Sequence, residues 1–220
     1  MFKFQFSEMN WNDYLSVKKN KIEFSLTIIF LTISLLSLTN FLQYAESRNG
    51  AVLDDALLSL FKPVDLTWFT FSFIYLSLII AVAYLIKHPA RLVFAFQVYV
   101  LIIASRTLSM YLLPLNPPVG IIILNDPFVQ LFGTGKILTK DLFFSGHTAT
   151  LLLLAIVSPN KKLKILFFIS TILVAFFVLA QHVHYTIDVV AAPVYVYACY
   201  SFALFIRNKV HLNDINDAGY

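Results

Sequence analysis

Charged residues are scarce in this sequence. Asp, Glu, Lys and Arg make up 13% of its 220 residues, whereas about a quarter is usual for a soluble domain. No polar stretch is long enough to enclose a hydrophobic core of its own, which excludes a separate soluble module. Cysteine occurs once, at Cys199, so no disulfide bond can form within the chain.

The sequence also lacks the patterns of several ligand-binding classes. Its histidines, cysteine and acidic residues nowhere have the spacing of a metal site, so we expect neither a metal nor another cofactor. The segment 133–136, which reads GTGK, lacks the upstream glycine of a nucleotide-binding P-loop. The net charge of +4 follows from the membrane topology described below, and no nucleic-acid partner is expected.

Apolar residues, in contrast, make up 59% of the chain and form long segments. A helix needs roughly 20 apolar residues to cross a hydrocarbon layer about 30 Å thick, because lipid offers an open backbone no hydrogen-bond partners. We predict an all-α, polytopic membrane protein built as a six-helix bundle. The predicted spans are 24–42, 66–86, 92–113, 142–157, 165–180 and 189–206.

These spans define one membrane domain, 24–206, which would carry the catalytic site. A cytoplasmic arm, 1–23, precedes it and mixes aromatic with basic residues, as expected of a helix lying on the membrane surface. A short polar tail, 207–220, follows it.

The distribution of Lys and Arg predicts the orientation. Basic residues concentrate in cytoplasmic segments close to the membrane, and six spans place successive connections on opposite sides. One side holds the arm, two tight turns and the tail, with Lys3, Lys18, Lys19, Lys21, Lys87, Arg91, Lys161, Lys162, Lys164, Arg207 and Lys209. The other side holds far fewer basic residues and several acidic ones. We therefore predict that both termini are cytoplasmic.

Two short motifs at the non-cytoplasmic ends of predicted spans carry the candidate chemistry. The first reads Ser145-Gly146-His147-Thr148, at the start of the fourth span. Ser145 can cap a helix, Gly146 lets a ligand approach the backbone, and the exposed amides attract an anion. His147 can then exchange protons with a bound substrate near neutral pH. A purely structural cap is the alternative interpretation.

The second motif runs from His184 to Asp188, reads HYTID and begins the last span on the same side. Residues four apart share one face of a helix, so the Asp188 carboxylate can accept a hydrogen bond from one ring nitrogen of His184. The other nitrogen is then free to attack a substrate. The alternative is a His–Asp pair that only caps the helix, although ionisable groups near lipid are costly to maintain. We predict that His147, His184 and Asp188 are catalytic.

Arg106 lies toward the same end of the third span, where its planar guanidinium could neutralise phosphate oxygens. The alternative is a side chain that only reaches for the membrane interface. Lys140 could attract an anionic headgroup, although loop lysines usually stay hydrated, and His182 is expected to be solvated. The candidate substrate-binding residues are Arg106, Lys140, Asp141, Ser145, Gly146 and Tyr185.

The stretch from Asp141 to Thr148, the HYTID motif and Arg106 together resemble the sphingomyelin synthase branch of the type 2 phosphatidic acid phosphatase (PAP2) superfamily. The resemblance covers about the second half of the chain. It implies a phosphohistidine mechanism in which His184 attacks phosphorus, Asp188 orients His184, and His147 protonates the leaving alcohol. It also implies phospholipid and lipid-alcohol substrates drawn from the bilayer, and a site on the non-cytoplasmic face.

The sequence departs from the lipid-phosphatase pattern of that superfamily. Tyr99 and Val178 stand where the pattern has a lysine and an arginine, and Thr107 replaces its proline. A phosphodiester carries one negative charge and a phosphomonoester two, so fewer basic residues favour the diester. We therefore expect transfer of a phospho-headgroup between lipids, although Thr139 and Lys140 replace a Cys-Gly pair of the synthases.

Two alternatives remain open from the sequence. A lipid phosphate or pyrophosphate phosphatase of the PAP2 type would use the same residues. A transporter or scramblase-like protein would instead use the histidines along a proton or substrate path, but such proteins tend to have repeats and polar residues at mid-membrane depth.

Overall fold

The computed structural model describes residues 6, 9–124 and 138–217, with side chains described as far as residue 210. These residues form seven α-helices, one 3-10 turn and no β-strand. The helices are α1 (Trp11–Ser16), α2 (Lys18–Ser47), α3 (Thr67–Leu85), α4 (Pro89–Leu112), α6 (Gly146–Val157), α7 (Lys161–Ala180) and α8 (Thr186–Asp217), and the 3-10 turn is η1 (Leu58–Leu60). The predicted all-α class is confirmed.

Five of the helices, α2, α3, α4, α7 and α8, are long and apolar enough to cross a membrane, as expected of a polytopic membrane protein. Helix α6, which corresponds to the remaining predicted span, 142–157, has 12 residues and measures about 18 Å at 1.5 Å per residue. Its predicted span began at residue 142, but Leu142 and Phe144 precede the helix and are buried at 2% and 0% exposure. Non-helical chain is tolerated at membrane depth when protein surrounds it.

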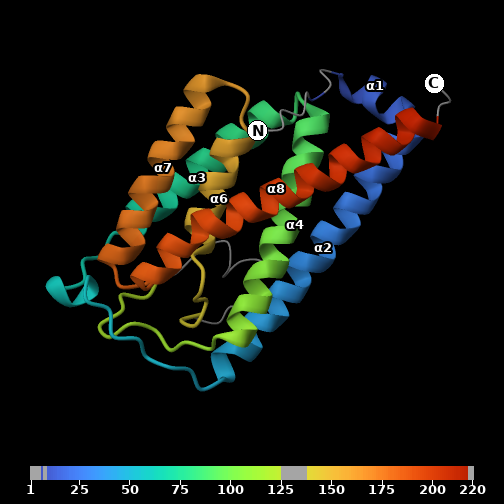
Figure 1. Cartoon of the computed structure of the whole chain (residues 1–220). Coiled ribbons are helices and arrows are strands. Elements are labelled where there is room, and N and C mark those ends of the chain that lie inside the picture. Colours follow the sequence, from blue (N-terminus) through green and yellow to red (C-terminus); the bar gives the residue numbers. More distant parts are fainter. Residues whose placement is uncertain (1–5, 7–8, 125–137, 218–220) are drawn as a thin grey trace.

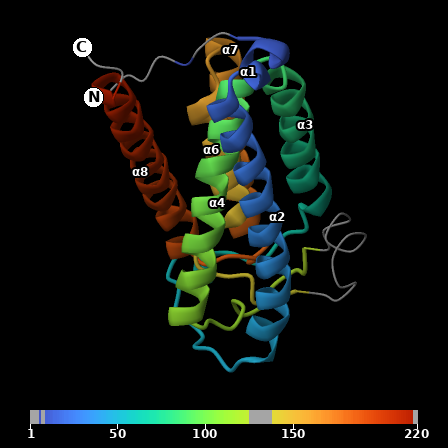
Figure 2. The same cartoon turned by 90° about the vertical axis from the view of Figure 1, so that its right-hand side faces the viewer.

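The helices lie side by side, and α6 occupies the middle of the bundle in contact with α3, α4, α7 and α8 (Figures 1 and 2). Helix α2 runs along α4 at the edge of the bundle. The connecting segments 48–66, 113–124, 138–145 and 181–185 gather at one end, which we call the loop end. Helix α1 and the last turns of α8 lie at the opposite end (Figure 1).

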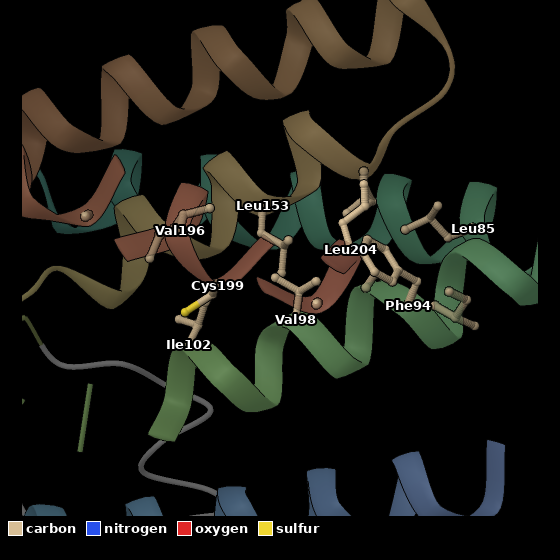
Figure 3. Close-up of a cluster of buried hydrophobic side chains, with 14 of the residues drawn as sticks. Leu85, Phe94, Val98, Ile102, Leu153, Val196, Cys199 and Leu204 are labelled. Atoms are coloured by element: carbon tan, nitrogen blue, oxygen red, sulfur yellow. The ribbon is translucent and has the colours of Figure 1, made fainter. Parts of the chain in front are cut away.

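Two apolar clusters hold α6 in place. The first joins it to α4 and α8 around Val98, Leu153 and Val196, which are almost fully buried (Figure 3). The second joins it to α3 and α7 around Leu151 and Val174, both at 0% exposure. Because side chains in such clusters interlock at crystal-like density, the start of α6 has a defined position relative to its neighbours.

The N-terminal arm packs against the opposite end of the bundle. Trp11 donates from its indole nitrogen to the Ile86 carbonyl at 2.6 Å, and Tyr14 is 1% exposed with its hydroxyl 3.3 Å from Glu23. Glu23 also accepts from Gln97 at 2.8 Å and pairs with Arg207 at 3.3 Å. Helix α2 begins within the predicted arm, at Lys18, so the arm continues directly into the first span.

Candidate active site

The two sequence motifs meet at the loop end. Ser145 is the N-cap of α6, and its hydroxyl accepts a hydrogen bond from the Thr148 amide. The Ser145 amide donates to the Asp188 carbonyl oxygen at 3.0 Å. This bond links the start of α6 to the first turn of α8, so residues 43 positions apart lie side by side.

His184 and Asp188 form a buried pair. The Nδ1 atom of His184 lies 3.2 Å from Oδ2 of Asp188, and the two residues are 1% and 0% exposed. The bond uses Nδ1, which leaves Nε2 of His184 for a substrate. The pair therefore has the connectivity that a nucleophilic imidazole requires.

The route by which the pair forms differs from the prediction. His184 was expected to share a helix face with Asp188, but α8 begins at Thr186, two residues after His184. Asp188 instead also accepts the Tyr185 amide at 3.2 Å, as an acidic residue does when it returns to the residue before a helix. Asp188 therefore caps the helix and holds His184 at once, so the two interpretations are compatible.

The two imidazoles lie close to each other. The ring centroids of His147 and His184 are 6.3 Å apart, with an angle of 65° between the planes. Hydrogen bonds to phosphate oxygens span about 2.7–3.2 Å, so a single phosphoryl group can contact both rings. One ring can then act on phosphorus while the other acts on an alcohol oxygen.

Arg106 is buried beside the start of α6. Its Nε donates to the Phe144 carbonyl oxygen at 3.0 Å, its Nη2 pairs with Asp141, and the residue is 7% exposed. A side chain that only reached for the membrane interface would be exposed, so the structure does not fit that alternative. A Cβ atom added to Gly146 would lie 1.8 Å from Nη1 of Arg106. The close approach that Gly146 permits is therefore that of the guanidinium.

Asp141 is an ionised carboxylate within electrostatic reach of the whole site. Burial raises the pKa of Asp141, but the charge and hydrogen bond of Arg106 outweigh that effect, and His184 and His147 add to it. The pKa therefore lies below its usual value. In this arrangement Asp141 offsets the positive charge of Arg106.

Tyr185 and Lys140 have structural partners in the loops. The Tyr185 hydroxyl donates to the Asn116 carbonyl at 2.9 Å and accepts from the Leu53 amide at 3.1 Å, which anchors the HYTID motif to two connections. The Lys140 ammonium donates to the Arg48 carbonyl at 2.6 Å. Lys140 is thus directed to the end of α2, and the structure does not bring its ammonium to the histidines.

Two residues near the site were not predicted in these positions. His182 was expected to be solvated, but it is 5% exposed, with Nδ1 3.1 Å from the Val119 carbonyl and its ring centroid 5.3 Å from that of Phe61. Residues of two connections, Val119 and Phe61, contact His182. The sequence around His182 could not indicate that these distant segments bury it. Asp55 was not predicted at all, yet it accepts the Thr186 amide at 2.6 Å. Its only sequence signal is that it is an acidic residue in a loop predicted to be non-cytoplasmic.

Among the described residues, no three His, Cys, Asp or Glu side chains are grouped as metal ligands. The geometry is instead that of two imidazoles, one orienting carboxylate and one buried guanidinium. Those groups can bind an anion, supply a nucleophile and exchange a proton.

Comparison with known families agrees with this chemistry. Residues 140–205 match the family model described as PAP2 superfamily C-terminal. The matched segment contains both motifs, while Arg106 lies before it. A search of curated proteins found no match to the chain. The chain is thus similar to the PAP2 superfamily, whose members are phosphatases and phosphotransferases, over the segment that carries both motifs.

Proposed function

We propose that the chain is a membrane enzyme that transfers a phospho-headgroup between lipids through a phosphohistidine intermediate. The single observation that carries this proposal is that the His184 ring, bonded to Asp188, has its centroid 6.3 Å from that of the His147 ring. A PAP2-type match over the same residues supports the class of reaction.

In the first step, Nε2 of His184 attacks the phosphorus atom of a phospholipid. A P–N bond forms and the P–O bond to the lipid alcohol breaks, while His147 in its protonated form gives a proton to the leaving oxygen. The positive charge that develops on the His184 ring is stabilised by Asp188 through Nδ1.

In the second step, His147 takes the proton of an acceptor hydroxyl as that oxygen attacks phosphorus. The P–N bond breaks, His184 leaves as the neutral ring, and the headgroup is now on the acceptor. With a lipid alcohol as acceptor the result is transfer, and with water it is hydrolysis. The same residues would therefore serve a transferase or the alternative enzyme, a PAP2-type phosphatase.

The charge of the site favours a phosphodiester substrate. Arg106 is paired with Asp141, so this ion pair adds little net positive charge to the phosphate pocket. The sequence has Tyr99 and Val178 where the phosphatase pattern has two further cations. A dianionic phosphomonoester needs more neutralising charge than this pocket offers, whereas a monoanionic diester needs less, and the unneutralised charge costs more free energy in a site of low dielectric.

We also infer that the site faces away from the cytoplasm. The basic residues of the two tight turns, such as Lys87 and Lys161, lie at the end opposite the loop end. The positive-inside rule assigns that basic end to the cytoplasm, and His147 and His184 then open to the other side.

The decisive experiment uses the full chain in lipid nanodiscs with a headgroup-labelled phospholipid donor, with ceramide or diacylglycerol as acceptor. Label on the acceptor supports transfer. Phosphate release from phosphatidic acid without any transfer would reassign the chain to the phosphatases, and neither activity in folded protein would refute both. His184→Ala should abolish turnover. His88→Ala, at the start of α4 and the opposite end of the bundle, is the matched control and should retain it.

A further inference from the structure

The connection between α2 and α3 is hydrogen-bonded to the start of α8. Asp55, in the connection between α2 and α3, accepts the Thr186 amide with Oδ2 at 2.6 Å and the Thr186 hydroxyl with Oδ1 at 2.9 Å. One carboxylate thus satisfies both donors of a residue that lies between His184 and Asp188 in the chain. The contact is made across 131 positions of sequence.

The position of Asp55 is itself well defined. Its Oδ1 also accepts the amides of Leu57 and Leu58 at 3.1 and 3.2 Å. Leu58 is 5% exposed and packs in one apolar cluster with Leu142 and Tyr185. The cluster and the turn therefore fix the carboxylate against the bundle, and Asp55 is held from both sides.

The His184–Asp188 geometry depends on this part of the backbone. His184 precedes α8, whereas Asp188 lies in its first turn, so their separation is set by the path of Tyr185 and Thr186. An acidic side chain that receives first-turn amides stabilises a helix start. Movement of reacting groups by about 1 Å can lower a rate by about two orders of magnitude.

We propose that Asp55 is a positioning residue: it fixes the backbone at Thr186 and thereby holds His184 and Asp188 in their reactive arrangement. The inference rests on the proposed function, because it takes that pair as the reacting groups. Asp55 acts through Thr186, and its role is separate from substrate binding.

The charge of Asp55 suits this role. Partial burial raises the pKa of Asp55, but the hydrogen bonds from Thr186, Leu58 and Leu57 lower it by more, so it lies below the usual value of 3.8. The carboxylate is therefore ionised throughout the range in which an imidazole exchanges protons.

The test compares Asp55→Ala with two control variants that also replace an aspartate by alanine. Asp54→Ala removes an exposed carboxylate from the neighbouring position, and Asp65→Ala removes a carboxylate that accepts the amide of Thr67, the first residue of α3, at 3.0 Å. Asp55→Ala should lower kcat roughly tenfold or more while KM changes by less than about twofold, because an interaction used only for positioning is lost. The two controls should keep kcat within about twofold.

A double-mutant cycle then asks whether Asp55 works through Thr186. Thr186→Val removes the hydroxyl but keeps the amide, and it should lower kcat less than Asp55→Ala does. The double variant should be no slower than Asp55→Ala alone, since both changes break one interaction. Thr186→Ser keeps both the amide and the hydroxyl donor, so this variant should retain nearly the full wild-type kcat. Independent, additive losses, or a rise in KM with kcat unchanged, would overturn the proposal.

Hydrogen–deuterium exchange of the peptide around Thr186 provides a readout that needs no turnover. Exchange there should accelerate in Asp55→Ala and stay unchanged in Asp54→Ala and Asp65→Ala. Faster exchange in a protein that shows no lipid activity would refute the proposed function and leave the Asp55 contact standing. Unchanged exchange, or a wild-type kcat in Asp55→Ala, would refute the positioning role.

Discussion

Replacing Gly146 with alanine has two opposite effects on stability: a gain in helix propensity and a clash with Arg106. Alanine favours helices over glycine by up to about 1 kcal/mol, and position 146 is the first residue of α6. Propensity alone would therefore predict a slightly more stable protein. However, the new Cβ would lie 1.8 Å from Nη1 and 2.6 Å from Cζ of Arg106, which no pair of atoms tolerates.

The clash is relieved by moving the side chain of Arg106, since the guanidinium is the end of a flexible chain. That movement disrupts the bond from Nε to the Phe144 carbonyl and the pairing with Asp141. A hydrogen bond to a charged group contributes about 1.5–3 kcal/mol. Loss of one such bond, less the amount of up to about 1 kcal/mol returned by helix propensity, gives a net destabilisation of about 0.5–3 kcal/mol, and loss of both gives more.

Activity should suffer more than stability, because the displaced guanidinium is also the group placed for phosphate. We expect Gly146→Ala to lower kcat/KM by about two orders of magnitude, as for other misplaced reacting groups, measured by headgroup transfer in nanodiscs beside thermal unfolding. Arg106→Ala removes the atoms that clash, so adding Gly146→Ala to it should cause no further loss. A Gly146→Ala enzyme with wild-type kcat/KM would refute the description of this contact.

Three further predictions concern the charges around the site. Asp141→Asn leaves the Arg106 charge less compensated, so the ratio of kcat/KM for phosphatidic acid to that for a phosphodiester lipid should rise about tenfold; an unchanged ratio would contradict the charge argument. The pKa values of Asp55 and Asp141 lie below 3.8. The stability that these carboxylates contribute is therefore complete above about pH 5 and is lost as pH falls through their folded-state pKa values. Thermal unfolding should show this loss of stability, and the loss should be smaller in Asp55→Asn. Lys140→Ala should lower kcat/KM by less than about tenfold, because the ammonium is bound to the Arg48 carbonyl; a loss as large as that of Arg106→Ala would instead place Lys140 at the substrate.

The helices could be predicted from hydropathy because a membrane imposes a simple length requirement on an apolar segment. The prediction 66–86 became α3, Thr67–Leu85, with nearly the same ends. The segment from 142 failed in its first four residues, because Ser145 caps α6 at its own position. Apolar composition does not distinguish a spanning helix from a buried, non-helical lead-in.

The site was predictable where its signal was local. His184 and Asp188 are only four positions apart, so a short stretch of chain holds their side chains near each other. The contacts of Arg106 with Asp141 and Gly146, and of Asp55 with Thr186, join distant segments. They depend on which helices and loops meet, and hydrophobic periodicity carries no information about that.

The central claim is that His184 becomes covalently phosphorylated. Wild-type protein mixed with a phosphate-labelled donor lipid, quenched without acid and digested, should yield one labelled peptide that contains His184, with an acid-labile P–N linkage located by mass spectrometry. His184→Ala should yield none, and His88→Ala should be labelled like the wild type. Turnover without any labelled histidine, or with the label on another residue, would contradict the account.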